Sequence, residues 1–254
     1  MLIRTTFLAA ILLASTVPAL TQTTPNTLSP KEKSEGWRLL FDGKTTNGWR
    51  STHGPAFPAT GWEVKDGLIT VTEHSGEEGG NAGDIITTRK YDNFELSVDF
   101  RITPGANSGI KYFVNLNMTP GHEGHGSAIG FEYQILDDAL HPDGKKGRDG
   151  DRTLASLYDM IPAAKDKPTK PIGEWNTARI VVNGAHCEHW LNGVKVVEYE
   201  RFTPQFRQLV ADSKYHVYPN FGEANDGYIL LQDHGFPVSF RNIKIRELPP
   251  APAK

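Results

Sequence analysis

Short runs in which apolar and polar residues alternate cover most of the chain, and clusters of Gly, Asn and Asp separate them. Alternation with a period of two predicts β-strands that bury one face. Asn183-Gly184 and Asn192-Gly193 each join two such runs, and Asn-Gly is a strong signal for a β-hairpin. Residues 206–213 suit a short helix or a loop, and no longer helical period is present. The pattern therefore predicts an all-β sandwich. The predicted strands are residues 37–41, 62–64, 68–72, 85–88, 94–102, 109–115, 130–138, 175–182, 186–191, 194–199, 228–232 and 238–247, with 155–160 as a possible further strand.

The run at residues 130–138 carries the most informative polar residues. Glu132 and Gln134 share one face, and three apolar side chains alternate with them on the other. A bulge near Leu136 would turn Asp137 to the polar face as well. The pattern Glu-x-Gln-x-x-Asp resembles the catalytic strand of laminarinase-like glycoside hydrolases, which read Glu-x-Asp-x-x-Glu in a concanavalin A-type sandwich. The alternative is a half-exposed strand whose polar face meets water.

The two ends of the chain differ in composition from the middle. Residues 1–21 read as a signal peptide, with Arg4 at its start and an apolar run from 7 to 20 that is short for a membrane span. An uncleaved anchor is the alternative. Residues 22–35 read as a flexible lead-in and residues 249–254 as a tail, which leaves a single domain at 36–248.

The cysteine content indicates the cellular compartment, and the net charge excludes one class of partner. The only cysteine is Cys187, so no internal disulfide can form, and an exported chain of this kind suits a periplasmic or secreted bacterial protein. The formal net charge is −3 and no basic stripe is present, which argues against nucleic acid as a partner. We expect no membrane association after signal cleavage. The pattern leaves the oligomeric state open.

Eight short sequence segments occur in order along the chain: GWRLLFDGK at 36–44, GWEV at 61–64, NSGI at 107–110, EYQILD at 132–137, GEWN at 173–176, HWLNG at 189–193, LQDHG at 231–235 and RNIKI at 241–245. Together these segments resemble the 3-keto-disaccharide hydrolase domain family. The resemblance implies a concanavalin A-like jelly roll of two antiparallel sheets in an exported bacterial protein. It also implies a carbohydrate substrate, namely a glycoside already oxidised to a ketone at sugar carbon 3.

A ketone at carbon 3 changes how a glycosidic bond can break. It acidifies the proton on carbon 2, so a base can remove that proton and the group on carbon 1 can leave by elimination. Hydration of the enone then completes a net hydrolysis. This route needs a base, an acid near the glycosidic oxygen and a group that holds the enolate oxygen. It tolerates Gln134 in place of a second acid, whereas an ordinary glycosidase needs two carboxylates.

Four residues are candidates for this chemistry. Glu132 is the first choice as acid or base, and a surface ion pair is its alternative role. Lys111, on the preceding strand, could lie beside Glu132 and either stabilise an enolate or neutralise the carboxylate. His189 and His234 are candidate general bases, because imidazole titrates near neutral pH. A structural histidine in a sheet is the alternative for His189.

Four more residues are candidates for gripping the sugar. Gln134 and Gln232 offer amides on strand faces, whereas Asp137 could equally cap a turn and Arg179 could equally form a structural ion pair. A non-catalytic carbohydrate-binding module of the same fold is the alternative function for the whole chain.

The sequence predicts no metal and no other cofactor, with calcium as an open possibility. His122 and His125 lie in a Gly-rich loop and lack an evident third ligand. Asp143, Asp149 and Asp151 alternate with glycines and could hold calcium, but they do not follow the EF-hand spacing, which favours a flexible loop.

Overall fold

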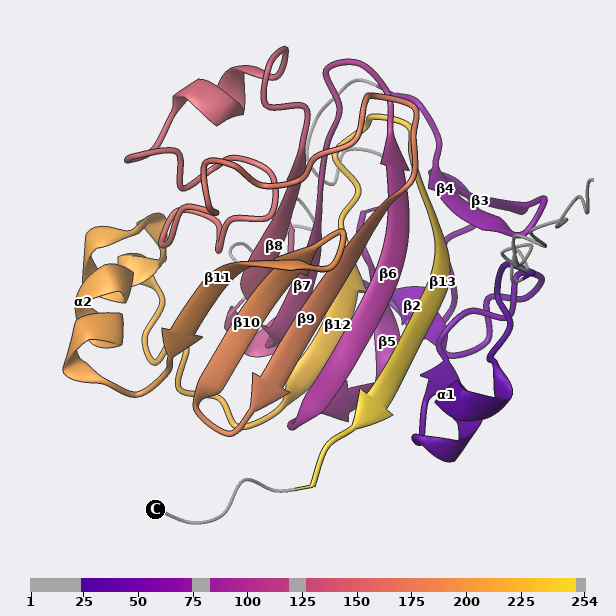
Figure 1. Cartoon of the computed structure of the whole chain (residues 1–254), viewed down its shortest axis with the longest axis horizontal. Helices are drawn as coiled ribbons and strands as arrows, with labels where there is room; N and C mark the ends of the chain where they lie inside the picture. Colours follow the sequence, from indigo (N-terminus) through magenta and orange to yellow (C-terminus); the bar gives the residue numbers. More distant parts are fainter. Residues whose placement is uncertain (1–23, 75–82, 119–126, 250–254) are drawn as a thin grey trace, which may run out of the picture.

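The computed structural model describes residues 24–74, 83–118 and 127–249 and shows two antiparallel sheets packed face to face (Figure 1). The predicted signal peptide, the end of the predicted tail and the His122–His125 pair lie outside the described residues. Within the described ranges, no helix is both long enough and apolar enough to cross a membrane.

The larger sheet has eight strands and the smaller sheet five, and every pairing between neighbouring strands is antiparallel. The larger sheet runs in the order β11 (Val194–Glu200), β10 (His186–Leu191), β9 (Asn176–Asn183), β6 (Phe94–Ile102), β13 (Val238–Glu247), β4 (Leu68–Val71) and β3 (Trp62–Lys65), with β1 (Arg38–Leu39) paired to β13. The smaller sheet runs in the order β2 (Trp49–Ser51), β5 (Ile85–Tyr91), β12 (Gly227–Leu231), β7 (Asn107–Val114) and β8 (Phe131–Leu136).

The core lies between the two sheets, where their apolar faces meet. Alternate residues of β9 and β10 are buried, as expected for strands with one apolar face. Tyr112 of β7 lies at the centre, with its ring edge-on to Phe94 of β6 and Phe131 of β8. The predicted concanavalin A-like sandwich is therefore confirmed as two packed antiparallel sheets.

Local sequence signals explain most of the turns and one helix. Asn192 and Gly193 both have positive φ, 49° and 85°, as a tight hairpin turn requires. Helix α2 (Pro204–Asp212) begins where the Thr203 side chain accepts a hydrogen bond from the Phe206 backbone, which settles the helix-or-loop alternative for this segment. Residues 155–160 form no strand of their own and contribute only isolated β-bridges.

Strand β8 is the last strand of the smaller sheet, yet its free edge is covered. The loop that follows β8 folds back, so that Ala155 N donates to Gln134 O at 2.8 Å and Tyr158 N donates to Glu132 O at 3.0 Å. All six residues of β8 are buried. The water-exposed polar face considered as an alternative for this strand is therefore excluded.

The N-terminal segment from residue 24 folds onto the domain, although its composition predicted a flexible lead-in. Helix α1 (Pro30–Ser34) starts with a capping box in which the Ser29 side chain accepts from Glu32 N while Glu32 accepts from Ser29 N. Glu32 also pairs with Lys244 of β13. The composition of this segment does not reveal these contacts, because they are a local helix cap and an ion pair with a residue far away in the sequence.

Asn26 is the main tether of this segment, and its loss should destabilise the domain. Asn26 N donates to the Asn242 side chain at 2.6 Å, and Asn242 N donates to Asn26 Oδ1 at 2.8 Å. We expect Asn26→Ala to lower the free energy of unfolding by about 1–3 kcal/mol, because the half-buried Asn242 N–H and Gly67 carbonyl lose the Asn26 side chain as a partner. Denaturant unfolding measures this, with exposed Thr27→Ala as the control; equal stability of the two variants would contradict the tether.

Candidate active site

A polar pocket of about 210 Å³ lies on the face of the smaller sheet that points away from the core. Strands β7 and β8 and the residues after β12 form its floor, and the segment after β8 together with residue 214 forms its walls. It brings together four of the predicted site residues: Glu132, Gln134, Gln232 and His234. The full lining is Asn107, Glu132, Gln134, His141, Asp143, Lys146, Tyr158, Lys214, Gln232 and His234.

Glu132 faces Lys111 across the β7–β8 ladder, as the sequence suggested. The two residues are direct partners in the register, and Lys111 Nζ lies 3.7 Å from Glu132 Oε2. Both residues are buried, with exposures of 4% and 3%, and Lys111 also donates to Ser127 Oγ and to Ala128 O. A buried charge is costly unless it is paired, so the Lys111 ammonium group stabilises the charged form of the Glu132 carboxylate in this pocket.

Gly109 makes room for the Glu132 carboxylate. A Cβ at position 109 would lie 2.5 Å from Glu132 Oε1 and 3.1 Å from its Cδ, which is closer than side-chain atoms approach. The backbone of Gly109 pairs with Gln134 in the ladder, so the strand itself cannot easily move aside. A glycine is thus required here by the position of the carboxylate.

We expect Gly109→Ala to displace the Glu132 carboxylate and to lower turnover by about 10²-fold, since small misplacements of a reacting group have effects of this size. The strand should stay folded, because the residue does not need a positive φ. Gly54→Ala is the control, because a Cβ there meets nothing within 4 Å. Full activity of Gly109→Ala would show that the carboxylate position does not matter.

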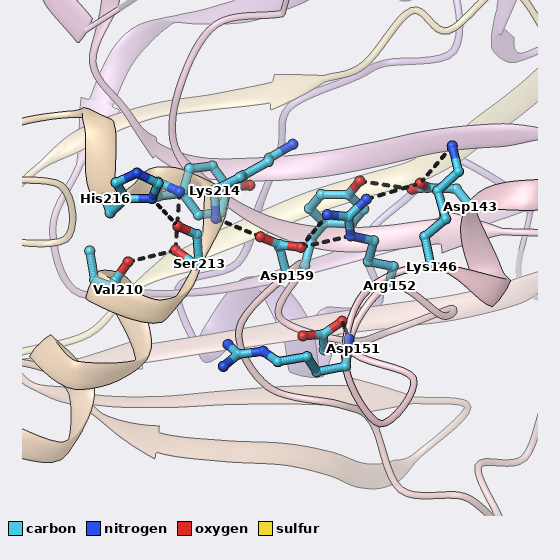
Figure 2. Close-up of polar contacts among 12 residues, drawn as sticks. Asp143, Lys146, Asp151, Arg152, Asp159, Val210, Ser213, Lys214 and His216 are labelled. Atoms are coloured by element: carbon cyan, nitrogen blue, oxygen red, sulfur yellow. Dashed lines mark hydrogen bonds and ion pairs between the residues drawn. The ribbon is translucent and has the colours of Figure 1, made fainter.

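The far wall of the pocket joins two segments that are distant in sequence, and Figure 2 shows the network that joins them. Asp159 accepts from Arg152 Nε and from Lys214 N, both at 2.6 Å. Arg152 also pairs with Asp143 at 3.3 Å. Asp143 in turn accepts from Tyr158 OH at 2.8 Å. Through this chain of contacts, residue 214 is held against the loop that follows β8.

Burial shifts the pKa values of two side chains in this wall. Burial, and then the neighbouring Glu132 carboxylate and Asp143, raise the pKa of Tyr158, so its hydroxyl stays protonated and donates. Burial, and then the nearby His234 ring, lower the pKa of His141. The two imidazole rings lie 6.0 Å apart between centroids. His141 Nδ1 accepts from Asp143 N at 3.2 Å, so its neutral ring carries the proton on Nε2.

Two predicted site residues lie elsewhere. His189 is fully buried between the sheets, where its Nε2 accepts from Tyr112 OH at 2.8 Å and its Nδ1 donates to Ala155 O at 3.0 Å. Burial lowers the pKa of His189 to about 4. Arg179 lies on the outer face of the larger sheet, paired with Glu95 and stacked over Trp190 at 4.6 Å. These positions correct the expectation that either side chain faces the sugar, and both residues take the structural role considered as their alternative.

Asp137 also takes its alternative role. The β7–β8 register runs without interruption to Leu136, so the expected bulge is absent. Asp137 instead accepts from the backbone of Gly105 at 2.8 Å and from that of Ala139 at 3.1 Å, and so caps the turn after β8.

The acids considered for calcium do not converge. Asp143 pairs with Arg152, whereas Asp151 accepts from Arg148 N at 2.9 Å. Among the described residues, ligand atoms gather in threes only at His186, Glu188 and Glu198. There Lys195 already pairs with both glutamates, at 3.3 and 2.7 Å, so an ammonium group supplies the positive charge that a metal would bring.

Comparison with known proteins decides the family. Residues 36–246 match the family described as a 3-keto-alpha-glucoside-1,2-lyase-like domain. The chain belongs to this family. A 3-keto-disaccharide hydrolase of Bacteroides thetaiotaomicron is 38% identical over 232 residues, which cover 85% of this chain and 79% of the relative. The predicted family, and with it the assignment to an enzyme family, is confirmed.

Two solved structures resemble the lyase-like domain over most of its length. Both come from Parabacteroides distasonis and were proposed to be glycosyl hydrolases. One is 31% identical with a TM-score of 0.76 and covers 89% of this chain and 100% of that chain. The other is 29% identical with a TM-score of 0.62 and covers 84% of this chain and 99% of that chain.

The sequence identified four of the ten residues that line the pocket of this lyase-like domain and did not assign the other six to it. His141, Lys146 and Tyr158 come from the irregular segment after β8, and Lys214 follows α2. Asp143 was considered only as a calcium ligand, and Asn107 was not assigned a role in the site. No periodic signal marks such loop residues, although a polar loop after a strand with Glu132 is where a wall is expected.

Proposed function

We propose that this lyase-like domain cleaves the glycosidic bond of 3-keto-glycosides or 3-keto-disaccharides by proton abstraction at carbon 2 and elimination. The observation that carries the proposal is the pocket itself, which sets a buried, lysine-paired carboxylate among two imidazoles and several amides. Family membership and the named relative support the substrate class.

Glu132 is the base of the first step. Its carboxylate takes the proton from carbon 2, and the electron pair of that C–H bond passes toward the carbon-3 ketone as an enolate. Lys111 does not line the pocket and pairs with Glu132 from the neighbouring strand, so it stabilises the carboxylate rather than the substrate. The ketone makes this proton acidic enough for a carboxylate base.

His141 holds the enolate oxygen. Its neutral ring carries the proton on Nε2, and its lowered pKa keeps it neutral at physiological pH, so it acts as a hydrogen-bond donor rather than an acid. Lys214 lies in the wall nearby and adds positive charge as the enolate forms.

A proton passes to the glycosidic oxygen as the bond from carbon 1 breaks, and Lys146 and Tyr158 are the groups of the pocket wall that can donate it. The enolate electrons form the double bond between carbons 1 and 2, and the alcohol leaves. Glu132 exchanges its proton with solvent while the enone is bound. Water then adds a hydroxyl to carbon 1 and gives its remaining proton to the acid, and carbon 2 receives the solvent-derived proton from Glu132. The balance is a net hydrolysis with no oxidant or reductant.

Turnover in deuterated water tests this reaction. A 3-keto-glucoside should be cleaved, and deuterium should appear on carbon 2 of the product when followed by NMR. The matched glucoside without the ketone should stay intact, because its carbon-2 proton is not acidic. Cleavage of the unoxidised glucoside, or cleavage without deuterium at carbon 2, would overturn the mechanism. Binding without any cleavage would indicate a carbohydrate-binding module.

We also propose that the protein works in the periplasm or outside the cell. The apolar run at residues 7–20 supports export. Mass spectrometry of the exported protein should find a mature chain that begins near residue 22, and a chain that retains residues 1–21 would contradict this.

A further inference from the structure

One end of the pocket contains buried polar atoms that the protein itself leaves without partners. Asn107 is 4% exposed, and its Oδ1 accepts no hydrogen bond. His234 Nδ1 is likewise buried without a protein partner. Both residues line the pocket. Most buried polar groups are satisfied, so atoms left open in a pocket indicate a ligand that completes them.

The ladder shows that these two residues lie at the same end of the pocket. Gln232 N donates to Gly109 O at 2.9 Å, so the chain after β12 continues alongside β7 in the antiparallel sense. Counting two residues further on each strand places His234 beside Asn107, and both share the face that carries Gln232 and Gly109. Whichever way the Asn107 amide is turned, it presents one donor and one acceptor.

Glu132 lies about one sugar ring away from Asn107. Its carboxylate rests against Gly109, and residues two apart on a strand are about 6–7 Å apart. A pyranose ring that presents carbon 2 to Glu132 therefore directs its opposite side toward Asn107. The hydroxyl groups on that side belong to carbon 4 and carbon 6.

We infer that Asn107, with His234 beside it, reads a hydroxyl group on the side of the keto-sugar away from carbon 2, and so makes the enzyme selective against deoxy sugars at that position. This inference rests on the proposed function, because it takes Glu132 as the group that meets carbon 2. Sites built to hydrogen-bond a substrate hydroxyl reject the analogue that lacks it, because their own polar atoms then stay unpaired.

The test is Asn107→Leu, which keeps the volume and removes both polar atoms of the amide. Values of kcat/KM are measured with a 3-keto-glucoside and with its 4-deoxy and 6-deoxy analogues. The natural enzyme should prefer the full substrate over one of the analogues by about 10–100-fold, and Asn107→Leu should lose that preference. Its Tm should be unchanged or raised, since a buried polar atom without a protein partner has been removed.

Asn176→Leu is the matched control. Asn176 is 2% exposed, but its Oδ1 accepts from Lys170 N at 3.1 Å and from Asn192 Nδ2 at 2.7 Å. Its replacement should lower the Tm and keep the preference for the hydroxyl. Binding titrations of the same three keto-sugars with Glu132→Gln measure their affinities without turnover.

The outcomes separate the two proposals. In one case the enzyme turns over 3-keto-glucosides, but Asn107→Leu keeps the full preference for the hydroxyl or lowers kcat/KM equally for all three sugars. Either result overturns the role of Asn107 and leaves the proposed function standing. If the natural enzyme neither binds nor cleaves any of the three keto-sugars, the proposed function fails and the inference fails with it.

Discussion

Glu132→Gln is expected to lower the turnover of 3-keto-glycosides by about 10²–10⁴-fold, the usual contribution of one general acid or base. The substitution keeps the shape of the side chain and removes only its charge and basicity. Lys111 retains its bonds to Ser127 and Ala128, so the domain should still fold. Steady-state kinetics with a 3-keto-glucoside measure the loss, and the value of KM should change far less than kcat.

Glu95→Gln is a matched control for this experiment. Glu95 is also a buried glutamate, 5% exposed, and it pairs with Arg179 and Arg246 on the outer face of the other sheet. Loss of the Glu95 charge should lower the free energy of unfolding and leave kcat unchanged. Full activity of Glu132→Gln would contradict a catalytic role for Glu132. Deuterium exchange at carbon 2 that persists while bond cleavage stops would recast Glu132 as the acid, with the base then sought at His234.

The stability of the domain is expected to fall by about 3 kcal/mol between pH 6.5 and pH 4 because of His189 alone. Burial lowers the pKa of His189 to about 4 in the folded protein, whereas an unfolded chain has the ordinary value near 6.5. As the pH falls through this window, the unfolded chain takes up the proton first. The contribution of His189 is therefore fully present above pH 6.5 and is lost as the pH falls toward 4.

Denaturant unfolding of the natural protein and of His189→Gln at pH 7, 5.5 and 4 measures this effect. Glutamine does not titrate, and its amide can still accept from Tyr112 and donate toward Ala155, the two partners of the imidazole. The difference in unfolding free energy between the two proteins should shrink or reverse as the pH falls. Parallel pH curves would show that His189 does not control acid stability.

The sequence contained a local signal for nearly every strand, because strand faces and hairpins depend on neighbours in the chain. The alternation around Glu132 placed it opposite the core residues Phe131 and Tyr133, and the Asn192-Gly193 turn set a hairpin. The same alternation set His189 between the apolar residues Cys187 and Leu191, and all three proved to be fully buried. That pattern indicated a core histidine more directly than a base.

Only the tertiary structure decided which loops close the pocket and which polar residues share it. His141 and Tyr158 lie in a segment without a period, and Lys214 reaches the pocket because Asp159 accepts a hydrogen bond from its backbone. Alternation assigns a side chain to one of two faces of its own strand. It does not say which face another sheet or loop will cover, because that depends on contacts between residues far apart in the chain.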